Sequence, residues 1–273
     1  MPPQEKSSSL SSRADRLLSF IDSHCHLSDE RVMDRLDDVV SRAQQAGVSR
    51  VMIGGVDPVD WSRQQILKSR YGAWIRTSFG LHPWRVEQMD SETVKRSLQD
   101  LAVELKSADA LGETGLDFHP RRDPVKFDLQ REAFRIQIRM AKQAGKPLVL
   151  HIVRSHADSI REIDVAGFGG NILIHSFSGS IEEASEWIKR GALLSFSGGF
   201  LVPGKFERMK KVLQWIPIEN LLLETDSPDQ AWRLDGINEP ACIPELYRGL
   251  ATLRGWELEF LTQKLDENFR NFG

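Results

Sequence analysis

Short apolar runs alternate with amphipathic segments along most of this chain. Eight of the runs have the length and composition of buried strands: Phe20-Ile21, 50–56, 74–81, Ala110-Leu111, 147–153, 171–175, 192–196 and 220–224. Helical patterns lie between them, and 243–269 holds two more amphipathic stretches. Eight strands that alternate with helices predict a parallel sheet, and about 250 residues of this pattern favour a single-domain α/β fold, a closed (β/α)8 TIM barrel.

The helices are predicted where apolar residues recur every three or four positions. Three such faces are expected to hold Val32, Leu36, Val39 and Ala43; Val94, Leu98, Leu101 and Leu105; and Leu129, Ala133, Ile136, Met140 and Ala144. Gly145 followed by Pro147 indicates the end of the last of these helices. Ser180 and Glu183 form a capping-box pattern at the start of another helix, which is expected to end at Gly191.

Length and composition indicate one ordered domain. The chain has 273 residues, of which 40% are hydrophobic and 27% charged, as in ordinary globular proteins. Residues 1–19 are rich in serine and predict a disordered N-terminal tail, with the barrel spanning 20–273. Basic residues among these serines weakly resemble an organelle transit peptide, whereas Glu5 and Asp15 argue against one.

Net charge and cysteine content limit the mode of nucleic-acid binding and the cellular compartment. The formal net charge is −3, so any nucleic-acid binding must be confined to one face of the molecule. Cys25 and Cys242 are too few for a disulfide framework, which favours a reducing compartment such as the cytoplasm. No apolar run approaches the ~20 residues that span a bilayer, so no membrane association is expected.

Nearly every predicted strand ends in a histidine or a carboxylate. These residues are His24, His26, His82, Glu113, His151, His175 and Asp226. Because a barrel places the C-terminal ends of its strands on one face, the seven side chains are expected to converge there. One buried histidine is usually an ordinary core residue, but burying this many polar groups is costly without a common partner. A metal is the partner that this set of side chains indicates.

Strand alternation separates the ligands from their neighbours. His24 and His26 lie two residues apart and therefore point the same way, while Cys25 points to the opposite side and is expected to pack in the core. The alternative for His24 and His26 is two surface histidines near a turn. Glu113, between glycines at a strand end, can bridge two cations, or it is merely a loop glutamate. Glu224 shares the face of Asp226 and is expected to support a neighbouring ligand.

The chain resembles a known family at this point. Five motifs occur in the order found in the TatD-type metal-dependent deoxyribonucleases, a branch of the amidohydrolase-type barrel hydrolases: DSHCHL at 22–27, GLHP at 80–83, GETGLDF at 112–118, HSFSG at 175–179 and ETDSP at 224–228. The resemblance covers nearly the whole chain beyond residue 20. Asn238 and Glu239 also fit it. The individual motifs are short, but five in order make a specific signal.

The resemblance implies roles for individual residues. His24, His26 and Asp226 would hold a first metal, His151 and His175 a second, and Glu113 would bridge them, while His82 would lie beside the substrate phosphate. The cofactors would be two divalent metal ions, and the donors permit Mg²⁺, Mn²⁺ or Zn²⁺. Thr114 and Phe118 replace the isoleucine and tyrosine common in the family. Arg154 is displaced from the expected position, which argues against a phosphate-binding role, and His156 is expected at the surface.

The expected activity is hydrolysis of phosphodiester bonds in DNA, as a 3′–5′ exonuclease acting on single strands. Two metals would activate a water, and Asp226 would take its proton, with Glu113 and His82 as the other catalytic residues. Aromatic and basic side chains just beyond the strand ends suit a single-stranded nucleic acid, although loop packing explains most of them individually: Trp84, Arg85, Phe118, Arg121, Arg122, Arg154, Phe177, Phe200 and Trp232.

Two alternatives remain open. The same metals could hydrolyse an ester or amide, as in a D-aminoacyl-tRNA deacylase, or the barrel could bind metal without catalysis. The complete set of ligands argues against the second alternative. No G-x-S-x-G or G-x-x-x-x-G-K motif is present, so neither a serine nucleophile nor a P-loop is expected. No protein partner is inferred.

Overall fold

The computed structural model describes residues 18–233 and 236–273. Its eight strands are β1 (Phe20–Cys25), β2 (Val48–Ile53), β3 (Ile75–Phe79), β4 (Ala110–Asp117), β5 (Leu148–Val153), β6 (Ile172–Ile174), β7 (Leu193–Phe196) and β8 (Leu221–Leu223). They are parallel and follow one another in sequence order. Each of the eight predicted strand regions therefore forms a strand, and the predicted (β/α)8 barrel is confirmed.

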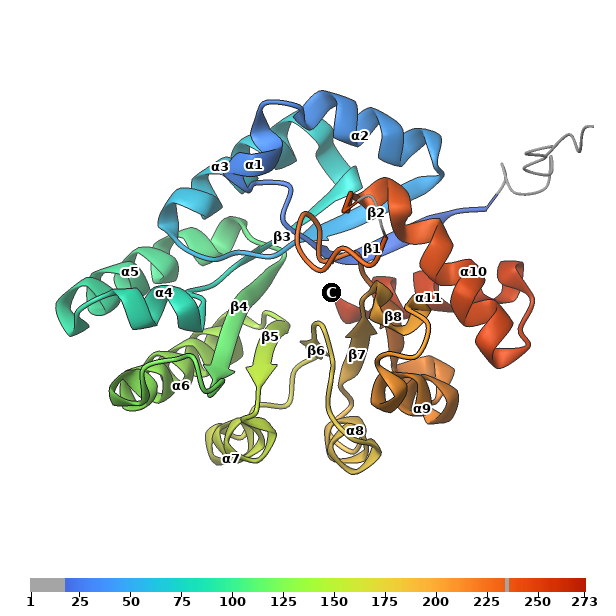
Figure 1. Cartoon of the computed structure of the whole chain (residues 1–273). Helices are drawn as coiled ribbons and strands as arrows, with labels where there is room; N and C mark the ends of the chain where they lie inside the picture. The colour runs from blue at the N-terminus through green and yellow to red at the C-terminus, as the bar shows by residue number, and fades with distance from the viewer. Residues whose placement is uncertain (1–17, 234–235) are drawn as a thin grey trace, which may run out of the picture.

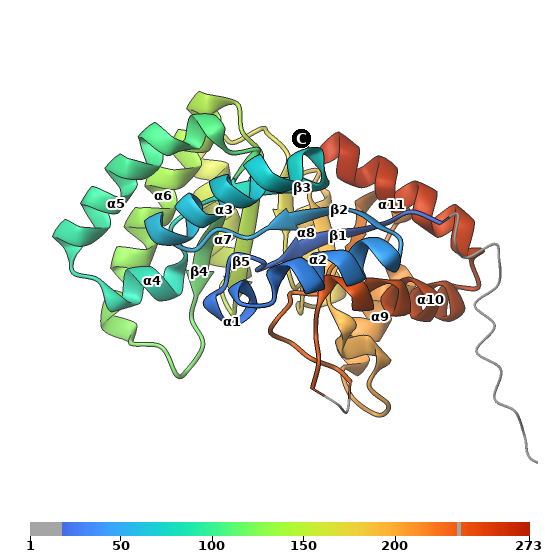
Figure 2. The same cartoon turned by 90° about the horizontal axis from the view of Figure 1, so that it is seen from above.

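The helices surround the strands (Figure 1). They are α1 (Glu30–Met33), α2 (Leu36–Gln45), α3 (Pro58–Tyr71), α4 (Pro83–Gln88), α5 (Ser91–Glu104), α6 (Phe127–Ala144), α7 (His156–Ala166), α8 (Ile181–Ile188), α9 (Glu207–Trp215), α10 (Ile243–Arg254) and α11 (Leu258–Phe272). Figure 2 shows α10 and α11 together on one side of the barrel, away from α4, α5 and α6. None of the helices that the structure describes is long and apolar enough to cross a bilayer.

The barrel is nearly closed where its first and last strands meet. The amide of Asp226 donates to the carbonyl of His24 at 3.0 Å, and the amide of His26 donates to the carbonyl of Ser227 at 2.7 Å. At the same junction, the buried side chain of Asp22 accepts hydrogen bonds from the amide and the hydroxyl of Thr225, at 2.9 and 2.6 Å. The chain segments that follow β1 and β8 are thereby fixed next to each other.

The helix signals are confirmed in most places. Gly145 takes the left-handed conformation (φ 62°) at the end of α6, and Ser180 and Glu183 form the capping box of α8. The pattern expected over 32–43 is divided between α1 and α2, with a break at residues 34–35. All four apolar residues of that pattern are nevertheless buried.

The buried face of α6 differs from the predicted one. Ala133 lies on it as expected, but Leu129, Ile136 and Met140 are only partly buried. Two glutamines are buried instead, because their side chains bond to backbone at the strand ends. Gln130 Oε1 accepts from the amide of Asp117 at 3.0 Å, and Gln137 Oε1 accepts from the amide of Leu81 at 2.8 Å. These bonds supply partners for backbone groups near the site.

Most of the predicted tail lies outside the described residues. Its last two positions, Leu18 and Ser19, are described: Leu18 packs against the core, and Ser19 Oγ donates to Ser49 Oγ at 2.7 Å. The prediction of a disordered segment over 1–19 therefore stays a prediction for residues 1–17.

Candidate metal centre

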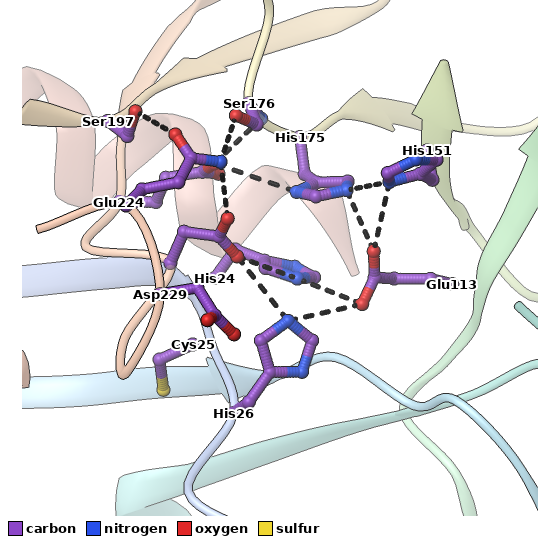
Figure 3. A network of polar contacts seen from close by, with 12 residues as sticks. His24, Cys25, His26, Glu113, His151, His175, Ser176, Ser197, Glu224 and Asp229 are labelled. Carbon is purple, nitrogen blue, oxygen red and sulfur yellow. Dashed lines mark hydrogen bonds and ion pairs between the residues drawn. The ribbon is translucent and has the colours of Figure 1, made fainter. Parts of the chain in front are cut away.

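Five histidines and two carboxylates meet at the C-terminal ends of the strands. Figure 3 shows four of the histidines, His24, His26, His151 and His175, around Glu113. Each comes from a strand or from the segment that follows it: His24 from β1, His26 directly after β1, His82 after β3, Glu113 from β4, His151 from β5, His175 after β6 and Asp226 after β8. All seven were expected from the sequence to converge. Six of them are buried, and the side chain of His26 is 17% exposed.

Glu113 occupies the middle of this cluster. Its Oε1 lies 3.3 Å from His24 Nε2 and 3.4 Å from His26 Nε2. Its Oε2 lies 2.7 Å from His175 Nε2 and 3.7 Å from His151 Nδ1. The two oxygens therefore face different pairs of histidines, which is the arrangement that a bridging carboxylate requires.

Asp226 presents one oxygen to the cluster and one to a supporting amide. Its Oδ1 lies 3.4 Å from His26 Nε2. Its Oδ2 accepts a hydrogen bond from Nε2 of Gln230. The same amide is fixed by two serines, because Gln230 Nε2 donates to Ser176 Oγ and Ser197 Oγ donates to Gln230 Oε1, both at 2.6 Å. The sequence offered no signal for Gln230, which lies in a loop after β8.

Two further carboxylates lie behind the histidines. Glu224 Oε1 is 3.7 Å from His175 Nδ1 and accepts from the amide of Ser176 at 2.6 Å, in the supporting position that strand alternation suggested. Asp117 Oδ2 is 3.6 Å from His151 Nε2. Sequence reasoning missed Asp117, although alternation along β4 places it on the same face as Glu113.

His82 is turned into the cavity by its position at the start of α4. Its Nδ1 accepts from the amide of Trp84 at 3.1 Å, so the proton of a neutral ring is on Nε2. Burial, together with the nearby charge of His151, lowers the pKa of His82 to about 4. Its Nε2–H lies 3.5 Å from Glu113 Oε2 and can donate a hydrogen bond to an anion.

The charges of the cluster are strongly coupled. Burial alone would raise the pKa of Glu113, but the histidines around it, first of all His175, hold that pKa well below its usual range. Burial would lower the pKa of His26, but Glu113 and Asp226 raise it to about 9. In the same way Glu113 raises the pKa of His175 well above its ordinary value, against the effect of burial. Without a metal, protons on imidazoles supply the positive charge that the two carboxylates require.

The donor atoms fit a divalent cation. His24 Nε2, Glu113 Oε1 and Asp226 Oδ1 are buried without a hydrogen-bond partner among the described residues. Three groups of donors each lie within 4.8 Å of one another: His24, His26 and Glu113; His24, His175 and Asp226; and His82, Glu113 and His151. A side chain at Gly54 would fill this space, since its Cβ would lie 2.5 Å from His24 Nε2. The unpartnered donors match the imidazole and carboxylate ligands that divalent metals take in proteins.

A cavity of about 940 Å³ opens above the cluster. The cluster forms one part of its wall, with His26, His82, Glu113, His151, His175 and Asp226 all lining it. Trp84 and Arg85 lie at its edge, and Trp84 is 43% exposed. A cavity of this size holds a substrate considerably larger than a single phosphate group.

A family model for the TatD-related DNases matches residues 21–272. The chain belongs to the TatD family. It is 31% identical over 258 residues to the uncharacterized metal-dependent hydrolase YabD of Bacillus subtilis, covering 91% of this chain and 96% of that protein. It is 32% identical over 254 residues to the 3′-5′ ssDNA/RNA exonuclease TatD of Citrobacter koseri, covering 89% and 94% of the two chains.

The fold gives the same result. The crystal structure of YjjV, a TatD homologue from Escherichia coli, matches with a TM-score of 0.83 at 26% identity and covers 93% of this chain and 97% of its own. This TatD-family protein is therefore a metal-dependent hydrolase, and its His, Glu and Asp cluster is the group of residues suited to bind divalent metal.

The remaining sequence predictions for this TatD-family chain have mixed outcomes. Cys25 is buried, donates from Sγ to the carbonyl of Met52 at 3.5 Å and points away from the histidines (Figure 3). His156 begins α7 as expected but is not at the surface, because its Nδ1 accepts from Trp187 Nε1 at 3.0 Å inside the protein. Arg154 is exposed and does not line the cavity, in keeping with the doubt raised by its position.

The aromatic and basic residues expected near the substrate are divided between the cavity and the core. Phe177 and Phe200 are buried, so they pack within the protein, as expected for most of these residues individually, and do not stack against a nucleic acid. Arg85 is paired with Asp57 at 2.5 Å. Arg122 lies over the ring of Trp84, with its guanidinium carbon 4.2 Å from the ring centre. Two tryptophans of the expected set, Trp84 and Trp232, do line the cavity.

Proposed function

We propose that this protein hydrolyses phosphodiester bonds of single-stranded DNA as a 3′–5′ exonuclease, using two divalent metal ions. The observation that carries the proposal is the position of Glu113, whose two oxygens face separate sets of histidines at the floor of an open cavity. The Citrobacter relative, named for 3′-5′ exonuclease activity on ssDNA and RNA, supports the choice of substrate. When bound, two metals supply Lewis-acid charge for the phosphate oxygens and lower the pKa of a water.

Individual residues of the chain would hold the metals and accept a proton. His24, His26 and Asp226 would hold one metal, His151 and His175 the other, and Glu113 both. The ions proposed are Mg²⁺, Mn²⁺ or Zn²⁺, because imidazole and carboxylate ligands are both present. Asp226 Oδ1 faces the cluster beside His26 and has no hydrogen-bond partner among the described residues, and it would accept the proton of the attacking water.

His82 would bind the scissile phosphate. Its ring is neutral near pH 7 and its Nε2–H faces the cavity, so it can donate to a phosphoryl oxygen as negative charge develops there. A donor that acts on the developing charge lowers the energy of the transition state more than that of the bound substrate. His82→Ala is therefore expected to reduce kcat more than it raises KM.

The decisive experiment compares two substrates in one preparation. Metal-loaded protein is incubated with 5′-labelled single-stranded DNA and, separately, with D-aminoacyl-tRNA, using Mg²⁺, Mn²⁺ and Zn²⁺ in turn. Shortening of the DNA from its 3′ end, stopped by a chelator, is the expected result. Deacylation without DNA shortening under every metal would refute the proposal and favour an ester hydrolase.

A matched histidine variant separates the catalytic effect from a general one. His119 lies just beyond β4 but outside the cluster, where its Nδ1 accepts from the amide of Arg121 at 3.2 Å. His119→Ala is expected to keep the activity of the unmodified protein, whereas His82→Ala loses it. Full activity of both variants would exclude His82 from the reaction.

A further inference from the structure

Part of the cavity wall is apolar and is formed by residues outside the metal cluster. They include Val202, Phe206, Met209 and Trp232. These residues come from the segment that joins β7 to α9, from α9 itself and from the loop after β8. Phe206 is 52% exposed, although its ring is one of the largest apolar groups of the chain. An aromatic ring left open to a functional cavity is the kind of exposed apolar surface that marks a binding site.

Two neighbouring glycines make room for both rings. A Cβ at Gly198 would lie 2.0 Å from Cδ2 of the Trp232 indole, so only glycine allows this ring to lie against the backbone. At Gly199 a Cβ would lie 3.3 Å from two atoms of the Phe206 ring, which is also close. Phe206 itself has a φ of 54°, a conformation that bulky residues rarely adopt. The backbone thus holds Phe206 at the cavity wall at a conformational cost, instead of packing its ring into the core.

The same segment carries a local positive charge. Residues 203–211 include Lys205, Arg208, Lys210 and Lys211 but only one carboxylate, Glu207, whereas the whole chain has a net charge of −3. Glu207 pairs with Lys210 at 2.8 Å. A cationic segment beside the exposed ring of Phe206 attracts a polyanion that carries flat apolar groups, such as a single-stranded nucleic acid.

We propose that Phe206 and Trp232 form a subsite that binds a nucleobase of the substrate by stacking. The inference rests on the proposed function, because the phosphate of the same nucleotide chain would lie beside the metal cluster. The metal cluster and the apolar residues line one cavity of about 940 Å³, and a nucleotide unit combines the matching anionic and planar apolar parts. Stacking on these rings accepts any base, so the subsite provides affinity without sequence preference.

A binding measurement tests the subsite without relying on turnover. Metal-loaded protein is titrated by calorimetry with thymidine 5′-monophosphate and with 2-deoxyribose 5-phosphate, which lacks the base. Stacking of one base on aromatic side chains corresponds to roughly 5–150-fold in affinity. The unmodified protein is therefore expected to bind the nucleotide at least about fivefold more tightly than the sugar phosphate. Equal affinities for the two ligands would overturn the proposal.

Variants at Phe206 assign the preference to this ring. Phe206→Ala is expected to lose most of the preference for thymidine 5′-monophosphate with unchanged binding of the sugar phosphate, and Phe206→Tyr to keep it. Phe260→Ala is the matched control, because Phe260 is 41% exposed on α11 and does not line the cavity. Equal loss for both ligands in Phe206→Ala would contradict stacking. Trp232→Leu tests the same preference from the other ring should Phe206→Ala prove unfolded.

Kinetics distinguish this inference from the proposed function. On single-stranded DNA, Phe206→Ala is expected to raise KM with little change in kcat, because stacking acts equally on the bound substrate and the transition state. DNA shortening with an unaltered KM in Phe206→Ala would refute the subsite and leave the nuclease function standing. No DNA shortening by the unmodified protein would refute the nuclease function, while the calorimetric comparison would still decide whether a base is bound.

Discussion

Nε2 of His151 lies 3.6 Å from Oδ2 of Asp117, on the side of the imidazole ring opposite Glu113. Asp117 is itself buried and accepts hydrogen bonds from Trp84 Nε1 and, at 3.1 Å, from Arg122 Nε. Burial would raise the pKa of Asp117, but the neighbouring His151 imidazole and the hydrogen bond from Trp84 hold it well below its usual range. A charged carboxylate in this place selects the tautomer of His151 that presents an unprotonated Nδ1 to a metal.

Replacing Asp117 by Asn is expected to weaken metal binding and activity by about 10–100-fold, as for other carboxylates that orient a metal-binding histidine. The amide keeps the size of the side chain but removes the charge. Metal content after dialysis and kcat/KM measure the effect. Asp123→Asn, which alters an exposed cap of a short helix, is the control and should change neither. A variant Asp117→Asn with full metal content and full activity would show that His151 needs no such support.

Glu113→Gln is expected to reduce activity more than any single histidine substitution in the cluster. The carboxylate of Glu113 has two oxygen ligands, each beside a different pair of histidines. An amide supplies only one weak oxygen ligand. Both metals should therefore be lost together, whereas His151→Ala should remove one. Metal stoichiometry by elemental analysis distinguishes these outcomes, with Glu132→Gln on the exposed face of α6 as control. Retention of one metal equivalent in Glu113→Gln would contradict the bridging role.

The seven cluster residues could be predicted from the sequence because a barrel imposes two strong regularities. Side chains alternate along a strand, which fixed His24 and His26 on one side and Cys25 on the other. Parallel strands also end on a common face, so residues far apart in sequence must meet there. The order of strands along the chain was sufficient for this, since consecutive strands are neighbours in the sheet.

Residues in the connecting segments escaped prediction for a physical reason. The position of Gln230 depends on a loop conformation with φ of 52°, and the position of Phe206 depends on another with φ of 54°. Neither conformation can be predicted from the periodic pattern of polar and apolar residues. His156 was expected at the surface because a helix start is usually exposed, but the Trp187 side chain of the next helix covers it.

Stability of the metal-free protein is expected to fall as the pH rises from about 6.5 to about 9. The pKa of His26 is raised to about 9 in the folded chain from its ordinary value of 6.5, so its protonation favours folding below pH 6.5. This contribution disappears as the pH passes through the folded-state pKa. His175, with its raised pKa, acts in the same direction, as does Asp22, whose pKa burial raises to about 8.

Metal should reverse this dependence, because it binds the unprotonated imidazoles and so competes with protons. Thermal melting between pH 6 and 9.5, with and without added metal, measures both trends. In the metal-free protein, His26→Gln should weaken the dependence of melting temperature on pH. Part of this dependence should persist, since His175 remains. A metal-free protein that becomes more stable over this range would contradict the protonated state inferred for the cluster.

Gln230 is expected to act on the reaction through Asp226 and not on the fold. Its amide donates to Asp226 Oδ2 and is fixed by Ser176 and Ser197, so that Oδ1 is directed to the cluster beside His26. Gln230→Leu keeps the approximate volume but removes the donor. A hydrogen bond to a charged group contributes about 1.5–3 kcal/mol, so kcat should fall by roughly 10–100-fold. The melting temperature should change little, because Gln230 lies in an exposed loop.

The control for this prediction is Gln88→Leu. Gln88 also lines the cavity, but its Oε1 accepts a hydrogen bond from Arg85 Nη1 at 3.1 Å. Among the described residues, it has no hydrogen bond to any of the seven cluster residues. Its replacement should therefore leave kcat nearly unchanged. A loss in Gln230→Leu that appears wholly in KM would place Gln230 in substrate binding, since an orienting bond to the proton acceptor acts on the bound complex. Equal effects of the two substitutions would show that the polarity of the cavity, and not the orientation of Asp226, determines the rate.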